Sequence, residues 1–301
     1  MNSQPHWSRR RFLAAAALSP FFTRIAWSGI PTNPDVIIIG AGAAGLAAAK
    51  TLLAQNISCL ILEGNNRIGG RAYTDHSIFG VPYDQGCHWL HNYEQNPWVP
   101  YAQQNGFTVY QEPHDDDEDV NIFDGDVSKI GNSSDFHKTC KDIEKAIDRV
   151  ASNGTDVSAE DAVKDINSPW KQLAKNWFGQ WDMGKDFDSF STVDWDNSPW
   201  STNYFCKEGF GSIVAHYGQA LPVQLNTAVT GIDWSGNDIK VQTAQGVLRC
   251  KKVIITVSTG ILAANNIKFT PSLSTEKQES FHKISMGCYN NIALQFKKDI
   301  F

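Results

Sequence analysis

The chain has 301 residues, of which 42% are hydrophobic and 19% are charged. This composition is typical of a globular protein with a sizeable core and excludes a largely disordered chain. The formal net charge of −6 argues against a nucleic-acid partner, because nucleic-acid-binding proteins carry an excess of basic residues on one surface.

Residues 1–28 have the features of an export signal. The pair Arg9-Arg10 precedes an apolar stretch, and a small-residue cleavage site follows at 26–28. This pattern resembles a twin-arginine signal, which routes folded proteins across a bacterial membrane. It predicts a periplasmic or otherwise exported protein that uses the twin-arginine export machinery. A basic N-terminal arm or a short membrane anchor is the alternative, although Pro20 interrupts an apolar run that is too short to span a bilayer.

The first predicted strand and helix flank a glycine-rich turn. Residues 35–39 are mainly apolar, as in a strand buried on both faces of a parallel sheet, and residues 43–55 have helix-forming composition. The turn between them has the pattern G-x-G-x-x-G, whose glycines allow a tight turn, a close approach of the backbone to pyrophosphate and close packing of the helix. The N-terminus of a helix also attracts phosphate groups. The pattern predicts a dinucleotide site that includes Gly40, Gly42, Ala43, Ala44 and Gly45.

The second predicted strand, residues 58–63, ends in an acid and leads into another glycine pair. Glu63 stands where a carboxylate can hold the ribose hydroxyls of a dinucleotide. The pair Gly69-Gly70 suggests a second close approach of the backbone to the cofactor, and Arg71 can neutralise pyrophosphate charge. Taken alone, this second motif would fit an ordinary Gly-Gly turn beside solvated arginines better than it fits a cofactor contact.

Together, GAGAAGLAAAKTL and EGNNRIGGRAYT resemble the FAD-binding start of the flavin amine oxidase superfamily, which includes monoamine, polyamine and amino-acid oxidases. The resemblance implies FAD as the cofactor. It also implies an α/β fold, with a Rossmann-type FAD-binding domain and an inserted, mainly helical substrate domain. The expected boundaries are residues 35–95 and 205–270 for the FAD-binding domain, and residues 96–204 and 271–301 for the substrate domain.

YDQGCHWLHNYEQNP, residues 83–97, resembles the segment that passes close to the flavin ring in polyamine oxidases. The resemblance implies that His91 lies near the substrate amine, and it favours the polyamine branch, although Asn92 stands where the family has glycine. A packed or solvated histidine is the alternative for His91 and, more strongly, for His88, which has no assigned role of its own. The cofactor-lining positions that the resemblance implies here are Gly86, Cys87, His88 and Trp89.

The segment expected to be inserted contains a helical pattern, an acidic run and several tryptophans. Residues 135–152 carry charge pairs at helical spacing. The acidic run 115–119 is expected to be a solvated loop, with a guide for a polycationic substrate as the alternative. Aromatic rings suit a cationic amine through cation–π contacts, but core packing is the stronger expectation for Trp170, Trp177 and Trp181.

The next part of the chain has the pattern of a helix followed by short strands. Runs at 223–226, 228–233, 239–243 and 247–250 predict a small β-meander. KEGFGSIV resembles the family helix that follows the substrate domain, and VIITVSTGIL resembles the segment that returns to the FAD-binding domain. LNTAVTGI resembles the strand whose valine backbone contacts the adenine, and this valine is Val229.

Two departures from the family pattern concern ISMGCYNNIALQF and the end of the chain. The first segment resembles a family strand whose lysine holds a water against flavin N5, and Asn291 stands at that position. An amide can bind the water but brings no positive charge, so the electron acceptor is either oxygen or another acceptor. The chain ends at Phe301 while the family pattern continues, so a C-terminally truncated protein or a fragment is expected.

The cysteines give no sign of a metal site, because they include no C-x-x-C pair. Individual disulfides remain open in an oxidising compartment, but buried free thiols are the main expectation. The six positions are Cys59, Cys87, Cys140, Cys206, Cys250 and Cys288.

The predicted reaction is the oxidation of a C–N bond in a polyamine or a related primary or secondary amine. A hydride equivalent passes from the α-carbon to flavin N5, and the resulting imine hydrolyses. His91 is the candidate for amine recognition, and Asn291 is the candidate for holding the water at N5. The alternatives are another FAD-dependent oxidoreductase of the same superfamily, of desaturase or amino-acid oxidase type, and an inactive truncated chain.

Overall fold

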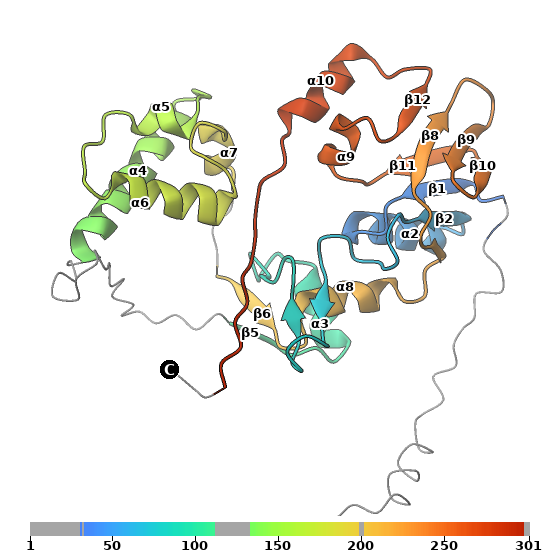
Figure 1. Ribbon diagram of the computed structural model, residues 1–301, viewed down its shortest axis with the longest axis horizontal. Helices are drawn as coiled ribbons and strands as arrows, with labels where there is room; N and C mark the ends of the chain where they lie inside the picture. Colours follow the sequence, from blue (N-terminus) through green and yellow to red (C-terminus); the bar gives the residue numbers. More distant parts are fainter. Residues whose placement is uncertain (1–30, 32, 112–132, 199–201, 298–301) are drawn as a thin grey trace, which may run out of the picture.

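A parallel β-sheet holds the first glycine motif at one end of its strands. In the computed structural model, which describes residues 31, 33–111, 133–198 and 202–297, the strand order is β11-β1-β2-β7 and every neighbouring pair is parallel (Figure 1). The strands span Val36–Ile39 (β1), Cys59–Leu62 (β2), Val223–Gln224 (β7) and Lys252–Ile255 (β11). The signal-like residues 1–28 and the acidic run 115–119 lie outside the described residues.

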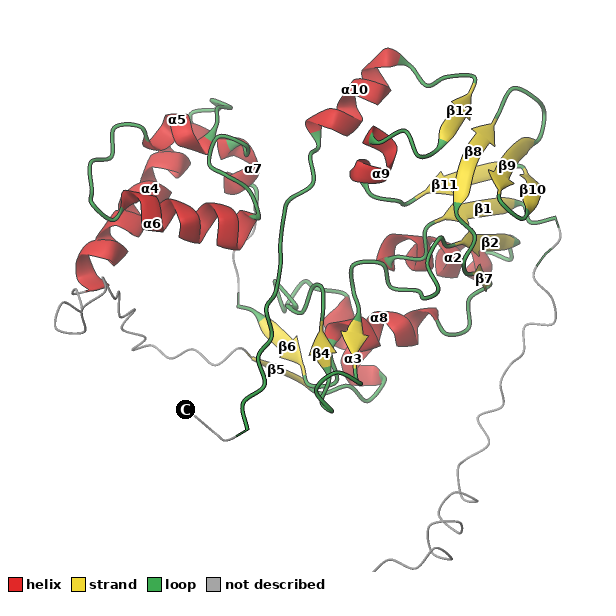
Figure 2. Cartoon of the chain, in the orientation of Figure 1, coloured by secondary structure: helices red, strands yellow, loops and turns green. Residues whose placement is uncertain are grey.

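The central strands bury side chains on both faces, as their apolar runs predict. The helix α2 (Ala43–Ala54) covers one face, α8 (Phe210–Gly218) packs on α2, and α3 (Trp98–Gln104) packs on α8. Ile38 and Ile61 are fully buried in the core beneath these helices. Ile37 and Leu60 are equally buried in another core, which they share with strands of a second sheet. Figure 2 shows this second sheet next to the parallel one. The result is three layers, of helices, parallel sheet and second sheet.

The second sheet contains most of the predicted meander. It comprises β8 (Val229–Asp233), β9 (Ile239–Thr243), β10 (Gly246–Cys250) and β12 (Lys268–Thr270). The strands β8, β9 and β10 run antiparallel, and β12 joins β8 in parallel. The prediction of a fourth meander strand at 223–226 is wrong. That segment forms β7 and pairs with β2, because Val223 packs in the first core.

A group of helices between residues 133 and 196 forms a unit with a core of its own. It consists of α4 (Ser133–Ser152), α5 (Ala159–Val163), α6 (Lys171–Lys175), the π-helix η2 (Asn176–Met183) and α7 (Thr192–Asp196). Phe136, Ile147 and Trp195 are buried in this core, and Figure 1 shows the unit to one side of the sheets. The helix predicted at 135–152 is confirmed by α4. Side chains from residues 98–109, which we expect from sequence to belong to the substrate domain, pack in the first core.

Two short two-stranded sheets lie outside the main sheets. The strands β5 (Val109–Gln111) and β6 (Tyr204–Cys206) pair antiparallel, so the chain segments that lead to and from the helical unit run side by side. The strands β3 (Thr74–Asp75) and β4 (Tyr83–Asp84) form the other antiparallel pair. The Asp84 carboxylate accepts hydrogen bonds from the N–H groups of Phe210 (2.8 Å) and Gly211 (3.1 Å). This carboxylate caps α8, because the first N–H groups of a helix have no partner within it.

The last described segment, residues 284–297, is extended and follows α9 (Thr259–Ala263) and α10 (Thr275–Lys283). The strand implied by ISMGCYNNIALQF is not formed, because no strand among the described residues pairs with this segment. The Cys288 N–H instead donates to the Gly184 carbonyl (2.8 Å) at the end of η2. All six cysteines are free thiols. Among the described helices, none combines the length and apolar character needed to cross a membrane.

Candidate functional site

The two glycine motifs form one continuous surface. The Gly69 N–H donates to the Ala41 carbonyl (2.8 Å), and Gly42 and Gly69 form an isolated parallel bridge. A Cβ on Gly70 would lie 3.3 Å from the Gly42 Cα. Both motifs are therefore close enough to contact the same ligand.

The first glycine motif contains one glycine that the protein's own packing does not require. A Cβ on Gly45 would lie 1.9 Å from the Gly40 carbonyl oxygen, so Gly45 is needed for α2 to pack on the turn. Gly42 has an ordinary φ of −75°, and no atom lies within 4 Å of the position a Cβ would take. This open space faces the N-terminus of α2, which no side chain caps and whose first turn has no acid. Free N–H groups and a helix dipole suit a phosphate group, so the site fits the pyrophosphate of a dinucleotide.

Thr256 fixes the turn, and sequence reasoning did not identify it. Its hydroxyl lies within hydrogen-bond distance of the carbonyl oxygens of Ile39 (2.9 Å) and Gly40 (3.0 Å). The resemblance predicted only that this segment returns the chain to the FAD-binding domain. Thr256 could have been found from its position directly after β11, beside the end of β1, because residues at such positions meet at one edge of a parallel sheet.

Glu63 is built into the same edge of the sheet. It is 7% exposed, and its two carboxylate oxygens accept hydrogen bonds from the N–H groups of Ala41 (2.7 Å) and Asn65 (2.8 Å). Each oxygen retains a further lone pair, so the predicted ribose contact stays a prediction. The Thr227 N–H donates to the Glu63 carbonyl (2.7 Å), and Val229, two residues later, is buried in the same core as Leu62. The adenine contact of Val229 also stays a prediction.

The two arginines of the second motif play different parts. The Arg67 guanidinium donates to the Gly70 carbonyl (2.9 Å) and lies over the Tyr73 ring at 4.2 Å. Arg67 therefore holds the Gly-Gly turn and is not a solvated arginine. The Arg71 guanidinium makes no hydrogen bond or ion pair with any described residue, so its charge is available to an anion.

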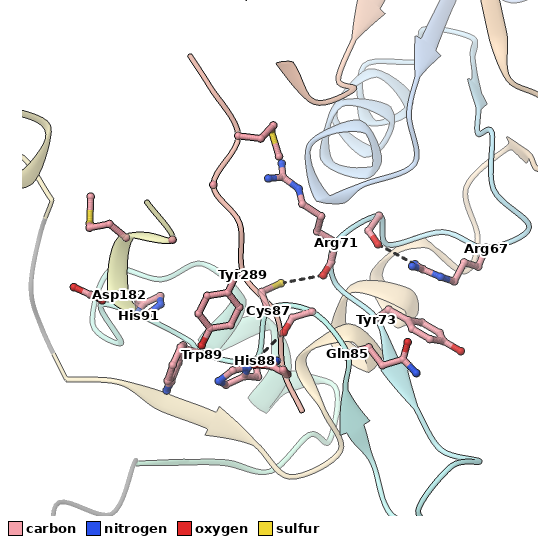
Figure 3. A pocket seen from close by; sticks show the side chains of 17 residues that line it. Arg67, Arg71, Tyr73, Gln85, Cys87, His88, Trp89, His91, Asp182 and Tyr289 are labelled. Carbon is pink, nitrogen blue, oxygen red and sulfur yellow. Dashed lines mark hydrogen bonds between the residues drawn. The ribbon is translucent and has the colours of Figure 1, made fainter. Parts of the chain in front are cut away.

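A pocket of about 660 Å³ begins at the second glycine motif and extends to the helical unit (Figure 3). It brings together eight of the residues singled out by sequence: Gly70, Arg71, Gly86, Cys87, His88, Trp89, His91 and Asn291. The other predicted residues lie outside its lining, at the ends of β1 and β2 or beside them: Gly40, Gly42, Ala43, Ala44, Gly45, Glu63, Gly69 and Val229. The candidate site thus has a dinucleotide-like end and a pocket end, joined at the contact between Gly42 and Gly70.

Gly86 lets the segment that lines the pocket run beside the second motif. A Cβ on Gly86 would lie 1.8 Å from the Arg71 carbonyl oxygen. The Cys87 N–H donates to this oxygen at 3.3 Å. His88 is packed, with its ring 4.1 Å from the Trp89 ring and 6.0 Å from the Phe205 ring.

His91 is oriented by a polar contact from the chain that returns from the helical unit. Its Nδ1 lies 2.7 Å from the Asn203 Oδ1. An amide oxygen accepts, so Nδ1 donates this hydrogen bond, and in the neutral tautomer that does so the lone pair lies on Nε2. The loop is anchored by Leu90, which is fully buried and exchanges backbone hydrogen bonds with Tyr204. Asn92 has a φ of +53°, so an asparagine adopts the left-handed conformation for which the family uses glycine.

Sequence reasoning missed Asp182, and its expectation for two tryptophans is wrong. Trp177 and Trp181 are 41% and 50% exposed rather than packed in the core. They lie on η2, where i→i+5 hydrogen bonding changes which side chains face the core. Asp182 is the one carboxylate among the described residues that line the pocket. Partial withdrawal from water raises the pKa of Asp182, and the nearby His91 acts in the opposite direction.

The chain matches the family described as flavin containing amine oxidoreductase over residues 43–198 and 174–301. A probable polyamine oxidase 4 of Arabidopsis thaliana is 30% identical over 294 residues, which cover 88% of this chain and 59% of that protein. Two solved structures share the fold with TM-scores of 0.63 and cover 83% of this chain and 63% of theirs. They are cyclohexylamine oxidase from Brevibacterium oxydans, at 22% identity, and putrescine oxidase bound to putrescine, at 17%. The chain spans about three fifths of the length of the polyamine oxidases it matches.

Proposed function

Because this chain belongs to the family of flavin-containing amine oxidoreductases, we propose that it binds FAD and oxidises the C–N bond of an amine. The observation that carries the proposal is the contact between Gly42 and Gly70, which joins an open helix N-terminus to the pocket that contains His91. The polyamine oxidase relative supports a polyamine or a related amine as the substrate.

The residues that would hold FAD follow the length of the site. The N–H groups that begin α2, together with Arg71, suit the pyrophosphate. Glu63 suits the ribose, and the backbone at Val229 suits the adenine. The segment from Gly86 to Trp89 would line the flavin ring. FAD, when bound, supplies the acceptor for the hydride equivalent that leaves the α-carbon of the amine.

In this proposal, His91 binds the substrate amine and Asn291 binds a water molecule. Hydride loss requires a neutral amine, and the Nε2 lone pair of His91 accepts a hydrogen bond from the amine N–H. Asn291 holds a water molecule through its amide. The aromatic rings of Trp89 and Tyr289 exclude bulk water from the reacting carbon. The imine that is released then hydrolyses in solution.

The proposal also covers the electron acceptor and the cellular location. Asn291 brings no cation to the pocket, which favours an acceptor other than oxygen or a slow reaction with oxygen.

The twin arginines Arg9 and Arg10 support export of the folded protein. Replacing both by lysine should keep the protein in the cytoplasm of a bacterial host. Export that continues unchanged would contradict this part of the proposal.

An FAD titration tests the cofactor site. Gly42→Val places a side chain in the open space at the start of α2, and Gly236→Val is the matched control, with open surroundings far from the site. Gly42→Val should weaken FAD binding at least about tenfold, because the phosphate and the N–H groups no longer meet. Gly236→Val should bind FAD like the wild type. Equal FAD affinity for the two variants would contradict the placement of the cofactor.

A further inference from the structure

The side chain of Thr256 lies where the first glycine turn meets the ends of β1 and β11. Its N–H donates to the Ile39 carbonyl (2.9 Å), so that carbonyl is satisfied without the hydroxyl. The Gly40 carbonyl, 3.0 Å from the hydroxyl oxygen, has no other donor among the described residues. A Cβ on Gly40 or Gly45 would lie 2.9 Å from the same oxygen. Two glycines of the motif therefore make room for this hydroxyl.

The peptide group between Gly40 and Ala41 is held at both of its ends. Its carbonyl accepts a hydrogen bond from the Thr256 hydroxyl, and its N–H donates to Glu63 Oε2 (2.7 Å). Because a peptide group is planar and its C=O and N–H point in opposite directions, the two contacts together fix the rotation of this plane. Gly40 itself resists rotation little, since glycine has the widest conformational freedom. Its φ of +105° is thus maintained by its neighbours.

The next peptide group leaves one N–H free. The Ala41 carbonyl accepts a hydrogen bond from the Gly69 N–H (2.8 Å). The N–H at the opposite end of this peptide group belongs to Gly42, and it donates to none of the described residues. This N–H lies at the start of α2, where a phosphate group is favoured. Its direction depends on the orientation of the peptide group before it.

We propose that Thr256 is a positioning residue for the cofactor. Together with Glu63, it holds the Gly40–Ala41 peptide group in the orientation that leaves the Gly42 N–H free for a phosphate oxygen. This inference rests on the proposed function, in which the pyrophosphate binds at the start of α2. The turn is ordered before the ligand arrives, so binding does not have to order it. Glu63 then serves both the ribose end and the pyrophosphate end of the site.

Amide hydrogen exchange of the FAD-free protein tests whether the peptide group is held. Thr256→Val keeps the shape of the side chain without its hydroxyl and should speed exchange of the Ala41 N–H at least about tenfold, because the peptide group can rotate. Thr256→Ser keeps the hydroxyl and should keep the slow exchange. The matched control is Thr139→Val, in the helical unit, where a buried hydroxyl lies 2.8 Å from the Asp135 carbonyl. Unchanged exchange in Thr256→Val would overturn the proposal.

Titrations with FAD and with ADP test the consequence for binding, at a temperature where circular dichroism shows every variant folded. ADP has the adenosine and the diphosphate of FAD but no flavin. Thr256→Val should weaken the binding of both ligands about tenfold, whereas Thr256→Ser and Thr139→Val should bind them like the wild type. Combining Thr256→Val with Glu63→Gln should weaken FAD binding less than the product of the two single losses, because both side chains hold one peptide group.

The outcomes separate the role of Thr256 from the proposed function. If the wild type binds neither FAD nor ADP, the proposed cofactor site is wrong, and the role of Thr256 in positioning the cofactor is wrong with it. If the wild type binds FAD and Thr256→Val binds it equally well, the role of Thr256 is wrong and the function stands. Single losses that multiply in the double variant would show that Thr256 and Glu63 act independently, which would also overturn the proposal.

Discussion

The backbones of Gly42 and Gly70 are in contact, with the position of a Gly70 Cβ 3.3 Å from the Gly42 Cα. This contact joins two motifs that lie apart in the chain into one surface. One side of it is the N-terminus of α2, and the other is the pocket that contains His91. A long ligand that binds phosphates at α2 therefore reaches the pocket with its other end.

The glycines of the first motif should respond differently to alanine. Gly45→Ala should lower the free energy of unfolding by about 3 kcal/mol, because the new Cβ would overlap the Gly40 carbonyl oxygen. Gly42→Ala should change it by no more than about 1 kcal/mol, because its φ is ordinary and its surroundings are open. Urea denaturation of the FAD-free protein measures both. A Gly45→Ala variant as stable as the wild type would contradict the packing described for α2.

His91 should matter for turnover through both its lone pair and its orientation. His91→Ala should lower kcat/KM about 100-fold, since the amine loses its hydrogen-bond acceptor. Asn203→Ala should cause a smaller loss, about tenfold, because the ring remains but its tautomer and angle are no longer fixed. His76→Ala is the control, an exposed histidine that contacts Ser212 outside the pocket lining. Steady-state kinetics with a diamine measure kcat/KM, and the loss should be largest for His91→Ala, smaller for Asn203→Ala and absent for His76→Ala. Equal kcat/KM values for His91→Ala and His76→Ala would exclude a role of His91 in turnover.

Cys87 should report on cofactor binding through its reactivity. The thiol is accessible, but the surrounding protein and the Asp84 carboxylate raise the pKa of Cys87. A raised pKa leaves less thiolate at neutral pH, so alkylation by iodoacetamide should be slower than for a free cysteine and should increase as the pH rises above 8. Mass spectrometry after labelling measures this rate.

Cys288 supplies the internal control for that experiment. It is also exposed, but it does not line the pocket. Added FAD should protect Cys87 and leave Cys288 unchanged. Alkylation of Cys87 at the same rate with and without FAD would show that the flavin does not lie against this segment.

Asn291 should limit the reaction of the reduced protein with oxygen. Asn291→Lys brings a positive charge into the pocket and should accelerate reoxidation in air-saturated buffer about tenfold, because a cation stabilises negative charge that develops on oxygen. Asn290→Lys adds the same charge next to the pocket lining and is the control. Stopped-flow absorption measures both rates. If the two reduced variants are reoxidised at the same rate, a charge at position 291 has no special effect on the reaction with oxygen, which would contradict the role given to Asn291.

The parts of the fold that depend on local patterns could be predicted from sequence. β1, α2 and β2 follow from apolar runs and glycines that are contiguous in the chain, and their parallel pairing is confirmed. β7 could not be placed in this way. Its two residues would fit the meander as well as the first sheet, and only the packing of Val223 decides between them.

Only one side of the pocket could be predicted from the sequence. The residues from Gly86 to His91 are adjacent in the chain, so one motif identified them together. Asp182 and Trp181 belong to a π-helix, which ordinary helical spacing does not anticipate. Asp182 lies near His91 only in the folded chain, where the Cys288 N–H also donates to the Gly184 carbonyl at the end of η2, a contact between residues far apart in the sequence.

The most direct test of the account is the visible absorption spectrum of the FAD-loaded protein, recorded without oxygen before and after a polyamine is added. We expect a flavin band that bleaches, because the amine in the pocket delivers a hydride equivalent to the bound flavin. A flavin band that persists after the polyamine is added would contradict amine oxidation. A protein that acquires no flavin band would contradict the cofactor site itself.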